Sequence, residues 1–193
     1  MSEKSLPASY KKDLIVPDPI APFCFPQCKT HKPNQTFRLI TSSKFIPHAR
    51  ASKQVEHVDI IQPVLKDLSI SRYTCTNSKM FVEKLQSTPP PPGTVPFKAD
   101  VVALFPSISQ ELIIADLKKR CHENPDILTK HQTSAETIVS IVQFIFETTY
   151  VRHDNTYYLQ LTETPMGGCL SSYLTDISLS YFDKYINTKM QYF

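Results

Sequence analysis

The chain has 193 residues, of which 41% are hydrophobic, and it carries a formal net charge of +3. This length and composition are sufficient for one domain with a hydrophobic core, and they exclude a chain that is disordered by composition. The five cysteines are too few and too irregularly spaced for a disulfide scaffold. No stretch approaches the roughly 20 apolar residues of a membrane helix, and the N-terminus lacks a signal-peptide pattern. We expect an intracellular protein, in the nucleus or cytoplasm, with no membrane partner.

The basic residues are concentrated near the N-terminus. Residues 1–54 hold nine Lys or Arg against three acids, whereas residues 106–193 hold seven against ten. A one-sided basic stretch suits a polyphosphate partner, either nucleic acid or nucleotide. The alternative is a solvated surface that keeps the protein soluble, and charge alone favours this alternative.

The first half of the chain is rich in proline, which forbids a long helix between Pro7 and Pro33 and predicts an extended arm. A brief strand is expected at 37–40. Apolar residues at helical spacing predict a helix over 55–68, which Pro63 kinks or divides. A second helix is expected over 77–86, with Asn77 or Ser78 as its cap.

A stiff connector from Pro89 to Gly93 follows, and we take it as the boundary between two parts, residues 1–92 and residues 93–193. After it, the apolar run around Asp100 predicts a strand. Ser107, with Gln110 three residues later, predicts the start of a helix that buries Ile108, Leu112, Ala115 and Cys121.

The remaining elements follow from clear patterns. A helix is expected over about 134–147, and strands at 150–153 and 156–161 flank Asp154-Asn155, a two-residue turn suited to a β-hairpin. A last helix is expected over about 170–189. The order of strand, helices, hairpin and helix predicts an α+β fold in which a small antiparallel sheet packs on helices. We expect the Asp100 strand to lie in that sheet alongside the 150–161 hairpin.

Asp100 is the first candidate functional residue. It is an acid within an apolar run, with an aromatic residue, Phe105, five positions later. A carboxylate there must reach solvent, a distant partner or a metal ion. The alternative is an Asp that caps the turn after the strand. A separate possibility is a metal site begun by Cys24, Cys28 and His31, although no second pair completes it, and ordinary packing is the favoured role of these residues.

Three blocks of the sequence, in order, resemble a reverse transcriptase of the kind carried by Penelope-like retroelements. The first is similar to the fingers motif, and it comprises Phe25 to Pro33 followed by Arg38 to Ser42. The second, Lys98 to Ile108, is similar to the first palm motif. The third is similar to the second palm motif, and it comprises Tyr157-Tyr158-Leu159-Gln160 and Thr164-Pro165-Met166-Gly167. The resemblance implies part of the fingers and palm, without a thumb.

The resemblance also implies roles for individual residues. Asp100 would be catalytic and, with the carbonyl of Val101, would hold Mg²⁺, since two hard divalent ions about 4 Å apart serve nucleotide transfer. Phe105 would reject a 2′-hydroxyl by bulk. The triphosphate would be bound by Arg38 and by Lys29 or Lys32. Met166 and Gly167 would lie under the nascent base pair. The implied partners are an RNA template, a DNA primer and a deoxynucleoside triphosphate.

Each of these residues also has a purely structural interpretation. Phe105 and Met166 are equally typical of core packing, Arg38, Lys29 and Lys32 of a solvated surface, and Gly167 of a flexible helix entry. The chain also departs from the family pattern, because no pair of adjacent aspartates follows, and Asp176 and Asp183 are isolated. One carboxylate cannot hold two divalent ions, so we expect this chain to be inactive alone.

Two functions therefore remain open. The first is a fragment of an RNA-directed DNA polymerase of a retroelement, whose activity belongs to the intact enzyme. The second is a non-catalytic protein, built on a reverse-transcriptase scaffold, that binds nucleic acid or takes part in an assembly.

Overall fold

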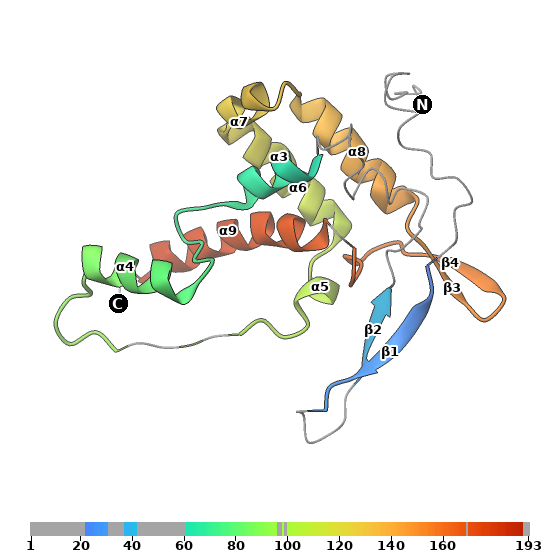
Figure 1. The fold of residues 1–193 in the computed structure, drawn as a ribbon, viewed down its shortest axis with the longest axis horizontal. Helices are drawn as coiled ribbons and strands as arrows, with labels where there is room; N and C mark the ends of the chain where they lie inside the picture. Colours follow the sequence, from blue (N-terminus) through green and yellow to red (C-terminus); the bar gives the residue numbers. More distant parts are fainter. Residues whose placement is uncertain are drawn as a thin grey trace.

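The computed structural model describes residues 22–30, 37–41, 61–95, 98, 100–168 and 170–190 of the chain. The expectations for the proline-rich arm before Pro22, for the helix before Ile61, for His31 and for Lys32 lie outside these residues. The described part is mixed α+β, as expected, with helices and two small antiparallel sheets (Figure 1). None of its helices is long and apolar enough to cross a membrane.

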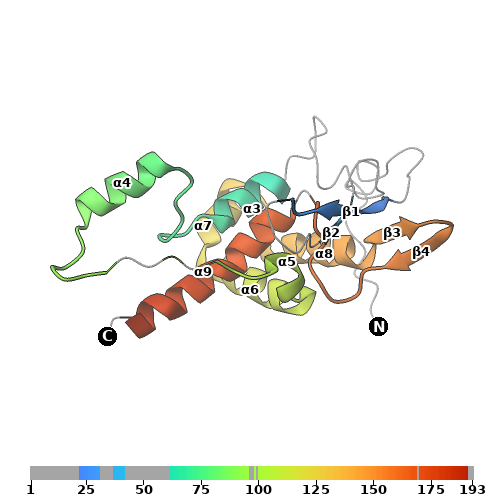
Figure 2. The same cartoon turned by 90° about the horizontal axis from the view of Figure 1, so that it is seen from below.

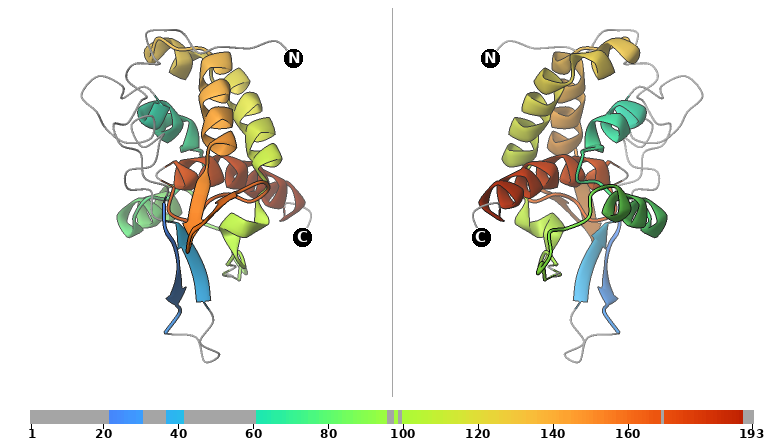
Figure 3. Two further views of the ribbon diagram at one scale, coloured as in Figure 1. Left: turned by 90° about the vertical axis from the view of Figure 1, so that its right-hand side faces the viewer. Right: turned by 90° about the vertical axis from the view of Figure 1, so that its left-hand side faces the viewer.

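The core is made by four helices: α3 (Ile61–Ser69), α6 (Gln110–Glu123), α8 (Ala135–Glu147) and α9 (Ser171–Met190). Figure 3 shows α6 and α8 running beside each other, with α9 crossing near one end of the pair. The short α7 (Pro125–Lys130), which the sequence did not predict, begins at Pro125, where a missing N–H costs nothing. The apolar faces of these helices supply most of the buried side chains, among them Leu65, Leu117, Ile138, Val142, Leu174 and Ile177.

The buried stripe of α6 differs from the expected one. Ile113, Leu117 and Cys121 are buried at steps of four residues, whereas Leu112 and Ala115 are exposed. The sequence predicts that this helix starts at Ser107. In the structure the hydroxyl of Ser109 accepts the capping bond from the amide of Leu112, so α6 begins at Gln110. Only Ile108 and Cys121 of the predicted stripe are buried.

The caps of two other helices agree with the sequence. Asn77 accepts a bond from the amide of Met80 at the start of α4 (Ser78–Ser87), and Ser134 accepts one from the amide of Thr137 at the start of α8. Of these two, α4 has no buried residue and lies at the edge of the structure (Figure 2).

The strand expected around Asp100 is absent from the described residues there, so this expectation is wrong. Asp100 and Val101 are irregular, Val102 and Ala103 form a turn, and a four-residue helix, α5 (Leu104–Ser107), follows. Ala103 adopts a left-handed conformation (φ +52°), which turns the chain before it can extend. The predicted sheet that joined this strand to the 150–161 hairpin does not form among these residues.

The two sheets are hairpins. β1 (Cys24–Cys28) pairs with β2 (Phe37–Thr41), and β3 (Tyr150–His153) pairs with β4 (Thr156–Leu159), both antiparallel. The second has its turn at Asp154-Asn155, as predicted, with Asp154 at φ +51°, a conformation that aspartate tolerates well. A bridge between Phe23 and Arg152 links the two hairpins, and the amide of Arg152 donates to the carbonyl of Pro22 at 2.8 Å.

Two polar ties hold α3 against its neighbours. The guanidinium of Arg120 donates to the carbonyls of Leu68 (2.8 Å) and Ile70 (2.6 Å), at the C-terminal end of α3. Asp67 accepts bonds from Lys130 (2.7 Å) and His131 (2.8 Å), at the end of α7. The first tie satisfies the carbonyl of Leu68, which the end of α3 leaves unpaired, and that of Ile70, just after the helix.

Candidate nucleotide and nucleic-acid interface

The loop from Thr164 to Gly168 connects parts of the chain that lie far apart in sequence. On one side, the carbonyl of Met166 accepts a bond of 2.9 Å from the amide of Thr41, the last residue of β2. Gly167 has a φ of +98°, and a Cβ on its backbone would collide with the carbonyl oxygen of Thr41. Only glycine allows β2 to approach this closely.

On its other side the same loop is joined to the segment between α5 and α6. The buried hydroxyl of Thr164 donates to the carbonyl of Ile108 at 3.0 Å. The side chain of Gln110 donates to the carbonyls of Gln160 (3.2 Å) and Glu163 (3.1 Å), and its backbone amide donates to Thr162. All three predicted blocks therefore meet at this loop, and Figure 3 shows the hairpin β1–β2 and α5 projecting on the same side of the helices.

Sequence reasoning did not single out Gln110 or Thr164 as joining residues. The sequence pattern indicates Gln110 only as part of a helix start and Thr164 only as part of a motif. Their partners are backbone carbonyls about 50 residues away in sequence, so no local pattern reveals these contacts.

Arg38 and Lys29 both lie on the hairpin β1–β2. Arg38 is exposed and pairs across the strands with Gln27, to whose side-chain oxygen its Nε donates at 2.7 Å. Alternation along β2 puts Arg38 on the same face as Ile40, the residue beside Gly167. Lys29 follows β1 directly and is half-buried. The structure thus brings Arg38 to the face that meets the Gly167 loop.

The residues predicted to act on the metal and the sugar lie on the chain leading into α5. Asp100 and Val101 are exposed, whereas Phe105 is half-buried within α5. Leu104, rather than Phe105, is among the described side chains that pack against the core.

The carboxylates of the described residues do not complete a two-ion site. No group of three or more His, Cys, Asp or Glu side chains gathers among them. Asp176 and Asp183 lie on α9 seven residues apart, and burial raises the pKa of each. Cys24 and Cys28 are free thiols on β1. A magnesium cage therefore does not fit the described residues as they stand.

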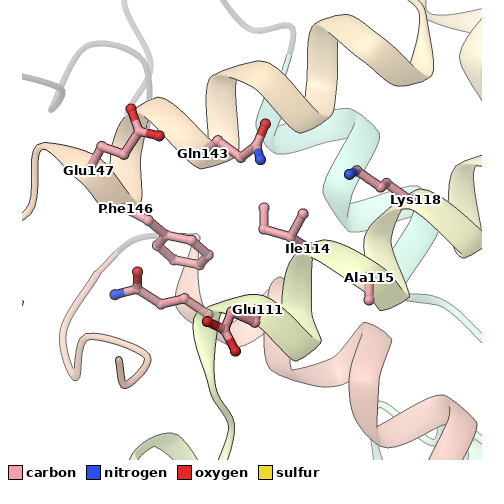
Figure 4. A pocket seen from close by; sticks show the side chains of 8 residues that line it. Glu111, Ile114, Ala115, Lys118, Gln143, Phe146 and Glu147 are labelled. Atoms are coloured by element: carbon pink, nitrogen blue, oxygen red, sulfur yellow. The ribbon is translucent and has the colours of Figure 1, made fainter. Parts of the chain in front are cut away.

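A groove of about 400 Å³ lies between α6 and α8 (Figure 4). Phe146 and Ile114 point into it, Glu111 and Glu147 lie on either side of Phe146, and Lys118 lies at the opposite end. Gln110 also lines it, but the Gln110 amide is engaged by the loop. No predicted site residue lines this groove.

Comparisons with protein-family models, with curated proteins and with solved structures found no match. The function has to be inferred from the residues themselves.

Proposed function

We propose that this chain is part of an RNA-directed DNA polymerase of the reverse-transcriptase type, from a retroelement resembling the Penelope-like elements. The observation that supports the proposal is the meeting of the three motif-like blocks at one loop. Thr41, the last residue of β2, belongs to the first block, Ile108 ends the second block, and Thr164 and Met166 belong to the third. Segments that serve one active site must converge in this way although they are distant in sequence.

In this proposal Arg38, with Lys29 or Lys32, binds the triphosphate of the incoming nucleotide. A guanidinium grips two phosphate oxygens at once, which a lysine cannot do. Phe105 limits the space beside the sugar, and its half-buried position on α5 leaves part of the ring accessible. Met166 and Gly167 form the support between the hairpin β1–β2 and the palm-like segment.

Magnesium would serve the intact enzyme as the ion that stabilises the attacking and leaving oxygens. Asp100 and the carbonyl of Val101 are its proposed ligands, but the described residues do not supply the remaining carboxylates. We therefore derive no catalytic step for them, and we expect the 193-residue chain to bind its substrates without extending a primer.

A second function is favoured by the exposed position of Asp100, which belongs to no group of three or more possible metal ligands among the described residues. If no further carboxylate joins it, the chain binds nucleic acid, or takes part in an assembly in the nucleus or cytoplasm, without catalysis. The two functions differ in whether deoxynucleoside triphosphate contributes to binding.

The test is the binding of a fluorescent primed RNA template to the whole chain, with and without complementary deoxynucleoside triphosphate, at several salt concentrations. Affinity should fall steeply with salt, because each neutralised phosphate releases counterions. Arg38→Ala should abolish the additional affinity that the triphosphate provides. The matched control is Arg72→Ala, which removes an exposed arginine that lies over the ring of Tyr73.

Three results would count against the polymerase proposal: a salt-independent response, no effect of the triphosphate, or equal losses in Arg38→Ala and Arg72→Ala. An effect of salt without an effect of triphosphate would support the second function. Primer extension in Mg²⁺ by this chain, abolished by Asp100→Asn, would show that the missing carboxylates are present after all.

A further inference from the structure

The junction between the two hairpins carries an alternation of aromatic and basic side chains. The guanidinium of Arg152 lies over the ring of Phe23, with 4.8 Å between the guanidinium carbon and the ring centroid. Across β3–β4, Arg152 stands directly opposite Tyr157, so the two side chains share one face of the hairpin. In the structure the side chains follow one another in the order Phe23, Arg152, Tyr157, although these residues are up to 134 positions apart in the sequence.

These rings are not part of the core. Phe23 is 50% exposed and Tyr157 is 62% exposed, and neither belongs to the core cluster. Tyr150, which alternation puts on the same face as Arg152, is also exposed. Exposed aromatic side chains that are held by a hairpin and separated by an arginine suit a partner with flat, apolar faces and negative charge.

A recess accompanies this row. It has a volume of about 470 Å³, and it is lined by Phe23, Cys24, Arg152, His153, Asp154 and Asn155. The Nε of Arg152 donates to the carbonyl of Asp154 at 2.9 Å, which fixes the guanidinium plane above Phe23. The recess is thus lined by an aromatic ring, a fixed cation and the imidazole of His153.

The charge of the two hairpins agrees with a polyanionic partner. Within residues 22–30, 37–41 and 150–159, the charged residues other than histidine are Lys29, Arg38, Arg152 and Asp154, three basic residues against one acid. On β1, alternation gives Phe25 the same orientation as Phe23, and Phe25 is exposed as well. The aromatic and basic row therefore continues from Tyr157 onto the hairpin that carries Arg38.

We propose that the Phe23–Arg152–Tyr157 row is a binding platform for single-stranded nucleic acid, on which successive bases stack while Arg152 pairs with the backbone. Aromatic stacking combined with a basic track is the way proteins bind single strands without reading sequence. The inference rests on the proposed function only in that both have a nucleic-acid ligand. It assigns the unpaired strand to Phe23, Arg152 and Tyr157, none of which is among the residues proposed to bind the triphosphate.

The test uses the full chain and two fluorescent 12-nucleotide probes, oligouridine and oligothymidine. Binding is measured at raised salt, where purely ionic attraction is weakened. Tyr157→Ala should weaken binding of both probes about fivefold or more, since one stacked base contributes on that order. Tyr157→Phe should restore binding. Arg152→Lys, which keeps the charge but loses the planar stack, should also weaken it.

The matched control is Tyr185→Ala. Tyr185 on α9 is 60% exposed and has a lysine, Lys189, over its ring, so it offers the same chemistry away from the hairpins. Wild-type affinity in Tyr157→Ala, or an equal loss in Tyr185→Ala, would overturn the platform. If Tyr157→Ala is unchanged while the primed template still binds and responds to Arg38→Ala, the proposed function survives and this inference fails. A wild-type chain that binds neither probe nor primed template removes both.

Discussion

The carbonyl oxygen of Thr41 occupies the space that a side chain on residue 167 would need. A neighbouring hydrogen bond of 2.9 Å, from the amide nitrogen of Thr41 to the carbonyl oxygen of Met166, holds the two segments together. The only attachment of β2 to the helical part that involves its backbone, among the described contacts, is made here. The absence of a Cβ at residue 167, together with the bridge between Phe23 and Arg152, thus positions the Arg38-bearing hairpin.

We expect Gly167→Ala to destabilise the protein by about 1–3 kcal/mol from backbone strain alone, and by more because the new methyl group meets Thr41. The measurement is urea unfolding. Gly93→Ala is the control, since Gly93 also has a positive φ (+85°) but nothing lies within 4 Å of its Cβ position. Equal losses in the two variants would show that the contact with Thr41 contributes nothing.

Arg120→Ala should destabilise the protein by about 1.5–3 kcal/mol, because two carbonyls at the end of α3 lose their charged donor. Lys118→Ala, at an exposed basic residue on the same helix, should change the free energy of unfolding by no more than about 0.5 kcal/mol. Thermal or urea unfolding of both variants is the measurement. A Lys118→Ala loss as large as that of Arg120→Ala would contradict the capping role.

Asp67 should stabilise the fold at neutral pH and cease to do so in acid. The hydrogen bond from Lys130, and then that from His131, lowers the pKa of its carboxyl below the ordinary value of 3.8. A lowered folded-state pKa gives stability that is fully present above the ordinary value and is lost as pH falls through the folded one. Asp67→Asn should therefore be less stable than wild type near pH 7 and equally stable in strong acid. A difference that persists in strong acid would mean that the charge is not its cause.

The contribution of Asp116 to stability should depend on pH in the opposite direction to that of Asp67. Burial raises the pKa of its carboxyl, so the unfolded chain loses this proton at a lower pH than the folded chain does. Its contribution to stability is therefore present in acid and lost as pH rises through the folded-state pKa. We expect Asp116→Asn to be more stable than wild type near pH 7, with the gain vanishing in acid. Unfolding curves at both pH values decide the matter, and a loss at pH 7 would refute it.

Truncation of Phe105 should lower the free energy of unfolding only slightly, whereas truncation of Leu104 should lower it more. Leu104 packs against the core among the described residues, whereas Phe105 is half-buried. Leu104→Ala should approach the roughly 2–5 kcal/mol of a core truncation, and Phe105→Ala should lose clearly less. Melting curves of the two variants test this. A larger loss in Phe105→Ala would make Phe105 a core residue and remove the support for its role beside the sugar.

The sequence predicted those elements whose signals are local. Asn77 and Ser134 cap their helices through bonds to residues three positions on, and Asp154-Asn155 turns the hairpin by its own backbone preference. The strand around Asp100 was predicted wrongly, because an apolar run looks alike in a strand and in a turn followed by a short helix. Ala103, whose φ is positive, gives no signal in the sequence.

The candidate site was predicted in its members but not in its geometry. Arg38, Asp100 and Gly167 came from motif-like blocks, whereas the bonds that join the blocks, such as that from Thr164 to Ile108, depend on the fold as a whole. The same holds for Phe23 and Arg152, since nothing local pairs a residue before β1 with one in β3.

Many of the bonds that hold the loop from Gln160 to Gly168 end on main-chain atoms. Thr41 donates its amide to Met166, Gln110 donates its amide to Thr162, and the side chains of Gln110 and Thr164 reach carbonyls. A carbonyl is present whatever residue carries it, so the positions of Glu163 and Met166 can change identity without loss of the bond. Substitutions in this loop can therefore remove the recognisable motif residues while the hydrogen bonds that join the loop to β2 and α6 are kept.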